Sequence, residues 1–326
     1  MASETAGKET PPFDVKRLAT IGFTVSDMER SIAFYSEVLG FEKVADFPAT
    51  GPAYDRLAGV FGVNMRIVHL RLGEQVIELT RYRSPPQGRP IPLPSYCHDR
   101  SFQHIAIVVS DMDKAFEILQ SHDVRQISPE PQTIPPSNVP AAGIRAFKFR
   151  DPDHHNLELI WFPPDKGDPY WQRPGERLFL GIDHTAITVG DTETSLEFYR
   201  DLLGMETMGG SINVGSTQEY LDNVLGVRVR ITSVSPAVKP PSVEFLHYEA
   251  PSGGRPMPAD TRADDIWHWE MSFVVSDVKA AASFLRAGGV RFVTPEVVAI
   301  DHPSLGFSKA IMVLDPDGHA VRLVEP

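Results

Sequence analysis

The sequence predicts an α+β protein built from four tandem βαβββ modules, each with one strand, one helix and three further strands. Three observations support this prediction: long internal repeats, an aspartate after the first strand of every repeat, and an apolar pattern that changes there from strand to helix. The 326 residues exceed what one ordinary core needs and suit two globular units.

The repeats align in register over long stretches. The matching segments are 18–44 with 182–208, 102–119 with 269–285, and 151–162 with 315–326. In the first pair, aligning Asp27 with Asp191 also aligns Gly40 with Gly204 without a gap. Chance does not place so many matches in register, so the chain carries copies of one structural unit.

Each module begins with an alternating strand that ends at an aspartate. These aspartates are Asp27, Asp111, Asp191 and Asp277. An aspartate at this place is well suited to cap the helix that follows. In the first module, one face of that helix would carry the apolar residues Met28, Ile32, Tyr35 and Leu39. Gly40 then stands where a helix C-terminal cap is wanted.

The later part of each module reads as short strands bounded by Gly, Pro and Asp turns. Clear examples are MRIVHLRL, QVIELTRY, IRAFKFR and NLELIWF. Pro-rich connectors separate the modules, at 84–99, 163–177 and 250–264. The predicted module boundaries are 17–83, 100–162, 178–250 and 265–326, and residues 1–14 are predicted to form a disordered tail.

The composition favours a protein that acts on a small molecule. Cys97 is the single cysteine, so neither an intrachain disulfide nor a multi-cysteine metal site can form, which fits a reducing compartment. A net charge of -12 argues against general binding to nucleic acid or anionic membranes. The sequence shows neither a signal peptide nor an apolar run near the roughly 20 residues of a membrane span. We therefore expect a cytoplasmic protein without nucleic-acid or membrane partners.

The segments FYSEVLGF and FYRDLLGM and the two DPD turns resemble those of the vicinal-oxygen-chelate superfamily. That superfamily includes glyoxalase I, methylmalonyl-CoA epimerase, extradiol dioxygenases and bleomycin-resistance proteins. The resemblance covers residues 17–326 and implies that paired modules curl their mixed sheets into two half-open barrels. Fold alone does not decide function, so the positions that carry chemistry need to be read residue by residue.

The resemblance implies metal ligands on the first and last strand of each module. The first-strand position, seven residues before the aspartate, holds Thr20, His104, His184 and Glu270 in module order. The last-strand position holds Glu78, Glu158, Glu244 and Arg322. Strand alternation directs His104 away from Ile105 and Ile107 and into the barrel. Glu158 lies within the apolar run NLELIWF, where a carboxylate is costly to bury unless a cation or donors meet it.

Two pairings of the modules are open. Pairing 1 with 2 and 3 with 4 leaves neither ligand set complete. Pairing 2 with 3 and 1 with 4, as in domain-swapped superfamily members, gives one complete set and one degenerate set. The complete metal-binding set is His104, Glu158, His184 and Glu244, and the other set is Thr20, Glu78, Glu270 and Arg322. In the second set the arginine cation could pair with the carboxylates without a metal.

The complete set resembles that of glyoxalase-I-like enzymes and implies one divalent metal ion, which could be Zn, Ni, Co, Mn or Fe(II). The expected function is a glyoxalase-I or epimerase-like lyase or isomerase that moves a proton through a metal-bound enediolate of a small oxygenated substrate. Glu158 and Glu244 are the candidate catalytic bases, and the apolar context of Glu158 favours it slightly.

Two alternatives remain for the function. One is an extradiol-type dioxygenase, whose iron site resembles two His and one Glu, and the other is a metal-free binding protein resembling bleomycin-resistance proteins. The sequence identifies neither the substrate nor the oligomeric state. Fusion of the modules removes the need for a homodimer without excluding one.

Overall fold

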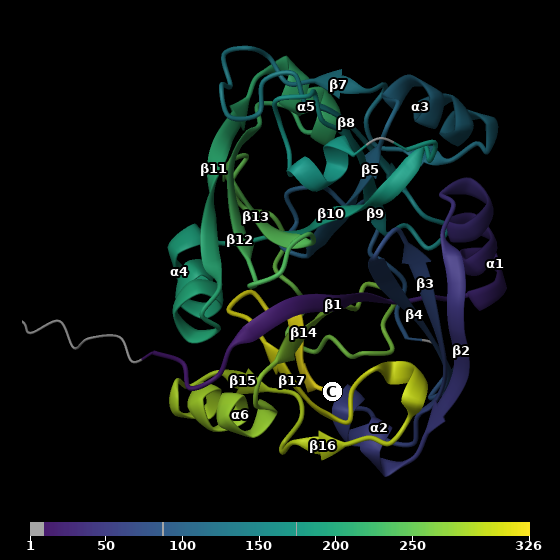
Figure 1. Cartoon of the computed structure of the whole chain (residues 1–326), viewed down its shortest axis with the longest axis vertical. Helices are drawn as coiled ribbons and strands as arrows, with labels where there is room; N and C mark the ends of the chain where they lie inside the picture. Colours follow the sequence, from purple (N-terminus) through teal and green to yellow (C-terminus); the bar gives the residue numbers. More distant parts are fainter. Residues whose placement is uncertain (1–9, 87, 174) are drawn as a thin grey trace, which may run out of the picture.

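The structure is a computed structural model that describes residues 10–86, 88–173 and 175–326 (Figure 1). Most of the predicted tail, residues 1–9, lies outside the described residues. Phe13, near the end of that predicted tail, is buried and its ring lies 6.2 Å from that of Phe284. The packed chain therefore begins before the first strand.

The first and third modules have the same elements in the same order. In the first they are β1 (Val15–Thr24), α1 (Met28–Ala33), β2 (Glu42–Thr50), α2 (Pro52–Ala58), β3 (Asn64–Leu72) and β4 (Gln75–Ser84). In the third they are β10 (Phe179–Thr188), α4 (Thr192–Leu196), β11 (Glu206–Val214), α5 (Ser216–Asp222), β12 (Arg228–Ser235) and β13 (Ser242–Ala250). Helices α1 and α4 each continue as a wider π-helical turn, over Phe34–Val38 and Glu197–Leu202.

The second and fourth modules are built alike, with a shorter middle part. The second contains β5 (Phe102–Val109), α3 (Met112–Ser121), β6 (Arg125–Gln126), β7 (Gln132–Thr133), β8 (Arg145–Arg150) and β9 (Asn156–Trp161). The fourth contains β14 (Trp269–Val275), α6 (Val278–Ala287), β15 (Arg291–Phe292), β16 (Val298–Ala299), β17 (Lys309–Leu314) and β18 (Ala320–Glu325). Single 3₁₀ turns lie at Pro169–Gln172 and Pro303–Leu305.

Helices α2 and α5 are additions to the expected strand and helix pattern. Each lies between the second and third strands of its module, begins after a glycine and ends before a residue with positive φ, Gly59 or Asn223. At seven residues each they are too short for a periodic signal to stand out in the sequence.

The predicted aspartate caps are confirmed in all four modules. Each aspartate has an extended backbone, and its carboxylate accepts a hydrogen bond from a backbone N–H in the first turn of the helix. The donors are the N–H groups of Arg30, Lys114, Thr194 and Ala280. The change from strand to helix at these residues is therefore fixed locally.

The strands form two mixed sheets, which confirms the predicted α+β fold class. One sheet, here the outer-module sheet, runs β15-β17-β18-β14-β1-β4-β3-β2 and joins the fourth module to the first. The other, here the central-module sheet, runs β11-β12-β13-β10-β5-β9-β8-β6 and joins the third module to the second. In each sheet the two modules meet through one antiparallel pair, β1 with β14 or β5 with β10 (Figure 1).

The two sheets are tied together by two equivalent buried contacts. The Tyr35 hydroxyl, after α1, donates to Asp151 Oδ2 of the second module at 3.1 Å, and Asp151 Oδ2 also lies 2.9 Å from His155 Nδ1. The third and fourth modules repeat this with Tyr199 and Asp315 at 3.1 Å. His155 therefore belongs to the buried core.

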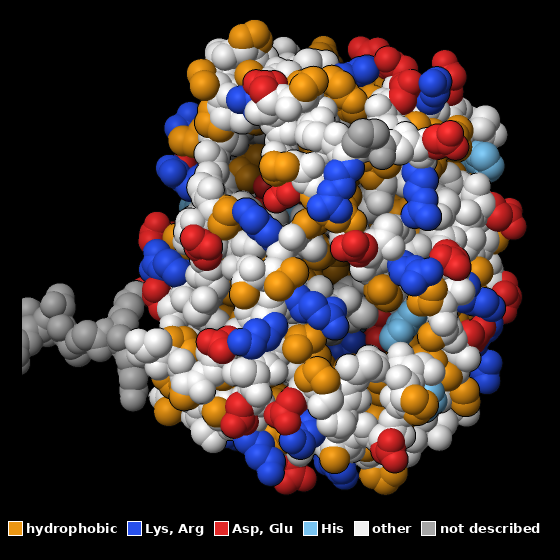
Figure 2. Space-filling view, in the orientation of Figure 1, with side chains coloured by type: hydrophobic (Ala, Val, Ile, Leu, Met, Phe, Trp, Pro, Cys, Tyr) orange, Lys and Arg blue, Asp and Glu red, His pale blue; other side chains and the backbone are white. Residues whose placement is uncertain are grey.

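The surface in Figure 2 carries acidic and basic side chains interspersed, without a field of one sign over the displayed face. None of the helices in the described part of the chain combines the length and apolar character needed to cross a membrane.

Candidate metal centre

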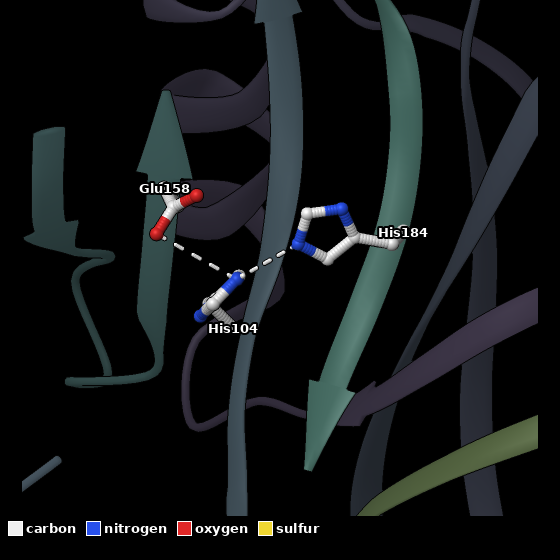
Figure 3. A group of neighbouring side chains, drawn as sticks. All are labelled: His104, Glu158 and His184. Atoms are coloured by element: carbon white, nitrogen blue, oxygen red, sulfur yellow. Dashed lines mark hydrogen bonds and ion pairs between the residues drawn. The ribbon is translucent and has the colours of Figure 1, made fainter. Parts of the chain in front are cut away.

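Two histidines meet at the junction of the second and third modules. The antiparallel register places His104 of β5 opposite Ala186 of β10, and His184 of β10 opposite Ala106 of β5. Both imidazoles therefore project from the same face of the sheet as diagonal neighbours. Their Nε2 atoms lie 3.2 Å apart (Figure 3).

Two carboxylates flank the histidines from the neighbouring parallel strands. Glu158 of β9 pairs with Ala106, and its Oε2 lies 3.7 Å from His104 Nε2. Glu244 of β13 pairs with Ala186 in the equivalent register, and its Oε2 lies 3.4 Å from His184 Nε2. The four predicted site residues thus lie around one point of the central-module sheet.

Three of these side chains form a compact group. His104, Glu158 and His184 are all buried, and their ligand atoms lie within 4.8 Å of one another. Within residues 10–86, 88–173 and 175–326, no other three His, Cys, Asp or Glu side chains meet this condition. Glu244 lies beside the group through its contact with His184.

Neighbouring acceptors fix which histidine nitrogens face the centre. His104 Nδ1 contacts Gln103 Oε1, and His184 Nδ1 lies 2.9 Å from Asp183 Oδ2. Each Nδ1 therefore carries its proton toward an acceptor, which leaves the Nε2 lone pair of a neutral ring directed at the other histidine. Two lone pairs and two carboxylates then converge on one buried point, an arrangement that needs a cation.

The pKa shifts of the two histidines and the two carboxylates agree with a site that lacks a positive charge. Burial, with Lys148 and His184 nearby, holds the pKa of His104 well below its usual range. For His184 burial is outweighed by Glu244, Asp183 and Glu158, which raise its pKa to about 9. Burial raises the pKa of both Glu158 and Glu244. A proton on His184 would supply the missing positive charge when no metal does.

The residue types match a divalent transition metal. Imidazole nitrogen and carboxylate oxygen together suit Zn, Ni, Co, Mn and Fe(II), and each histidine already has the outer hydrogen bond that metal-binding histidines use to fix their orientation. The residues present therefore fit one divalent ion.

The outer-module sheet holds the other predicted set at the equivalent place. Glu78 pairs with Gly22 as Glu244 pairs with Ala186 in the central-module sheet. Arg322 pairs with Ser272 as Glu158 pairs with Ala106. Arg322 Nη1 lies 3.1 Å from Glu78 Oε1 and 2.7 Å from Glu270 Oε1. The buried guanidinium thus supplies the positive charge between the two carboxylates.

The remaining contacts complete this cluster. Arg322 Nε donates to Ser272 Oγ at 2.6 Å, and Nη2 makes a long contact of 3.4 Å with Thr20 Oγ1. His69 Nε2 lies 2.8 Å from Glu78 Oε2. The cavity beside the cluster has a volume of about 40 Å³, which suits one or two water molecules.

Sequence reasoning missed Lys148 and Asp222, which contact the central site. Lys148 of β8 pairs with Glu158 across the sheet, and its Nζ lies 3.6 Å from Glu158 Oε2 and 2.6 Å from Asp222 Oδ1. A lysine between two phenylalanines in a predicted buried strand is the signal that could have identified it. Asp222 lies at the end of α5, and nothing in the local sequence marks it.

Comparison with known proteins agrees with this fold. Residues 17–159 and 181–323 match the Glyoxalase/Bleomycin resistance protein/Dioxygenase superfamily, and the chain belongs to that superfamily. The predicted family is therefore confirmed, with two matches that together cover most of the chain.

Among its relatives, the chain is 34% identical over 163 residues to a 2-epi-5-epi-valiolone epimerase from an Actinomyces species, spanning 49% of this chain and 85% of that protein. It is 25% identical over 208 residues to a lactoylglutathione lyase of Arabidopsis thaliana, spanning 64% of this chain and 62% of that protein. The crystal structure of glyoxalase I from Zea mays gives a TM-score of 0.60 at 18% identity over 95% of this chain and 92% of that one. At this identity the structural likeness shows the fold alone.

The outer cluster predicts a large loss of stability when its cation is removed. Arg322→Met leaves two buried carboxylates without their shared cation, which we expect to cost about 3–5 kcal/mol of unfolding free energy in urea titrations. Thr20→Ala removes only the long contact and should cost less than about 1 kcal/mol. Equal losses in the two variants would show that the guanidinium does not hold this cluster together.

Proposed function

We propose that the chain is a metal-dependent lyase or isomerase that moves a proton between carbon atoms of a small oxygenated substrate. The observation that carries the proposal is the convergence of the Nε2 atoms of His104 and His184 with two carboxylates at the junction of β5 and β10. Sequence similarity to an epimerase and to a lactoylglutathione lyase supports this type of reaction.

His104, His184, Glu158 and Glu244 would hold one divalent ion. When bound, such an ion supplies Lewis acidity toward two adjacent substrate oxygens, which makes the neighbouring C–H bond more acidic. Two neutral histidines, two carboxylates and one divalent cation would together carry no net charge. Such a site tolerates an oxygen ligand from a neutral or singly charged substrate.

The residues of the chain accept and return the proton. A ligand carboxylate, Glu158 or Glu244, lies beside the point where the substrate carbon would sit and can take the proton as a general base. The raised pKa of each carboxylate brings it closer to neutral pH, which improves its ability to return the proton to the neighbouring carbon.

An extradiol-type dioxygenase is the second candidate. The compact group of His104, His184 and Glu158 has the composition of the two-histidine, one-carboxylate iron site, with Glu244 beside it. Oxygen uptake coupled to Fe(II)-dependent ring cleavage of a catechol would favour this function. A metal-free binding protein of the bleomycin-resistance kind would show neither reaction and bind no metal.

The ligand sets predict one divalent metal ion per chain. Metal analysis of purified protein should give about one equivalent, because the outer cluster already contains its own cation. His104→Ala or His184→Ala should each abolish tight binding, whereas Thr20→Ala should retain it. Two tightly bound equivalents would contradict the proposal that only the central site binds metal.

Proton transfer can be followed with solvent deuterium. In D₂O, the metal-loaded protein should place deuterium on carbon in its substrate, detected by NMR, with 2-epi-5-epi-valiolone and lactoylglutathione as the first compounds to test. His184→Ala should lose this exchange together with the metal. Oxygen consumption without carbon deuteration would contradict a lyase or isomerase and support the dioxygenase.

A further inference from the structure

A fully buried ion pair lies beside one of the two site carboxylates, Glu158. Lys148 and Asp222 are each 2% exposed, and their charged atoms are 2.6 Å apart. The same Lys148 Nζ lies 3.6 Å from Glu158 Oε2, the oxygen that also faces His104. The ammonium group is therefore held between Glu158 and an aspartate from another module.

Asp222 is itself fixed from three sides. Its Oδ2 accepts hydrogen bonds from the Tyr248 hydroxyl at 2.9 Å and from Gln218 Nε2 at 2.8 Å, while Oδ1 faces Lys148. Gln218 in turn accepts from Asn213 Nδ2 at 2.9 Å. The ion pair thus connects α5 of the third module to β8 of the second in one rigid arrangement.

The outer modules show that the fold does not require this ion pair. The position of Lys148, opposite the last-strand ligand, is taken by Met312, which pairs with Arg322. The position of Asp222, the last residue of α5, is taken by Ala58, the last residue of α2. Met312 and Ala58 pack in one apolar cluster. Burying two charges is costly, and apolar residues fill the same place in the same architecture.

We propose that Lys148, held by Asp222, is a positioning residue that fixes Glu158 as a permanent metal ligand and leaves Glu244 as the carboxylate that moves to accept the proton. This inference rests on the proposed function. A fixed cation beside a ligand carboxylate restricts the rotation of that carboxylate and so orients the oxygen that faces the metal.

The two carboxylates differ in the way that this inference requires. Glu158 is confined between Lys148 and His104, and its side chain is 7% exposed. Glu244 lies opposite Ser233, and its side chain is 22% exposed. Among the described residues, the one charged partner within 4.0 Å of its carboxylate is His184. Glu244 therefore has the freedom to leave the metal and approach a substrate, in contrast to the preference for Glu158 from sequence context.

The test is a thermodynamic cycle on metal affinity in the full-length chain. The variant background is Lys148→Met with Asp222→Ala, which removes both charges of the ion pair together and introduces the apolar pair that the outer modules already use. Glu158→Gln and Glu244→Gln are each made in the native and the variant background, and Zn²⁺ dissociation constants are measured by chelator competition. Thermal melting followed by circular dichroism verifies that every variant folds.

In the native background, Glu158→Gln should weaken Zn²⁺ binding about 100-fold. In the variant background the same substitution should weaken binding less than about 10-fold, because Glu158 without Lys148 contributes less to the affinity. Glu244→Gln should change affinity by the same factor in both backgrounds, within about twofold, because Lys148 does not hold it. If the ion pair were merely structural, its replacement would lower the melting temperature, and each Gln substitution would change Zn²⁺ affinity by the same factor in both backgrounds. That result would overturn the inference.

If the native chain bound no divalent metal, the proposed function itself would fail. That result is distinct from metal binding in which Lys148 has no effect on the contribution of Glu158.

Discussion

The antiparallel pairing of β5 with β10 is the constraint on which the candidate site depends. It brings a histidine from the second module and one from the third into diagonal contact on one face, although neither module alone holds a complete ligand set. The adjacent parallel strands then add one carboxylate from each module at matching positions. A shift of one residue in this register would place the two histidines on opposite faces of the sheet.

The same constraint operates in the outer-module sheet with a different electrostatic outcome. There β1 and β14 place Thr20 and Glu270 where the central sheet has His184 and His104. Arg322 then supplies from within the chain the positive charge that the central site needs from outside. One backbone arrangement used twice thus yields a self-contained ion cluster and a cluster that needs an added cation.

Local signals in the sequence predicted the modules and the helix caps, and the resemblance to the superfamily predicted the four central site residues that lie together in the structure. The aspartate after each first strand is a short-range feature, and its cap forms within three residues. The local strand pattern does not decide how the modules pair, because either pairing satisfies it. The ligand positions favour pairing the second module with the third, because only that pairing completes a set. Lys148 and Asp222 were missed because their partnership joins two modules and exists only once the sheet is formed.

The base assignment shows the same limit of local reasoning. An apolar sequence context around Glu158 correctly indicates burial, whereas the ammonium group of Lys148 beside it comes from a different strand and has no signal in that context. Glu244 lies opposite Ser233, and its side chain is more exposed than that of Glu158, 22% against 7%.

The most direct measurement is anomalous diffraction from crystals grown with Zn²⁺, collected on both sides of the zinc absorption edge. We expect one strong peak per chain, bounded by His104, Glu158 and His184 and within about 2–2.2 Å of the histidine nitrogens and the carboxylate oxygen. A peak of similar height between Glu78 and Glu270, or none at the junction of β5 and β10, would contradict the assignment of a single central metal centre.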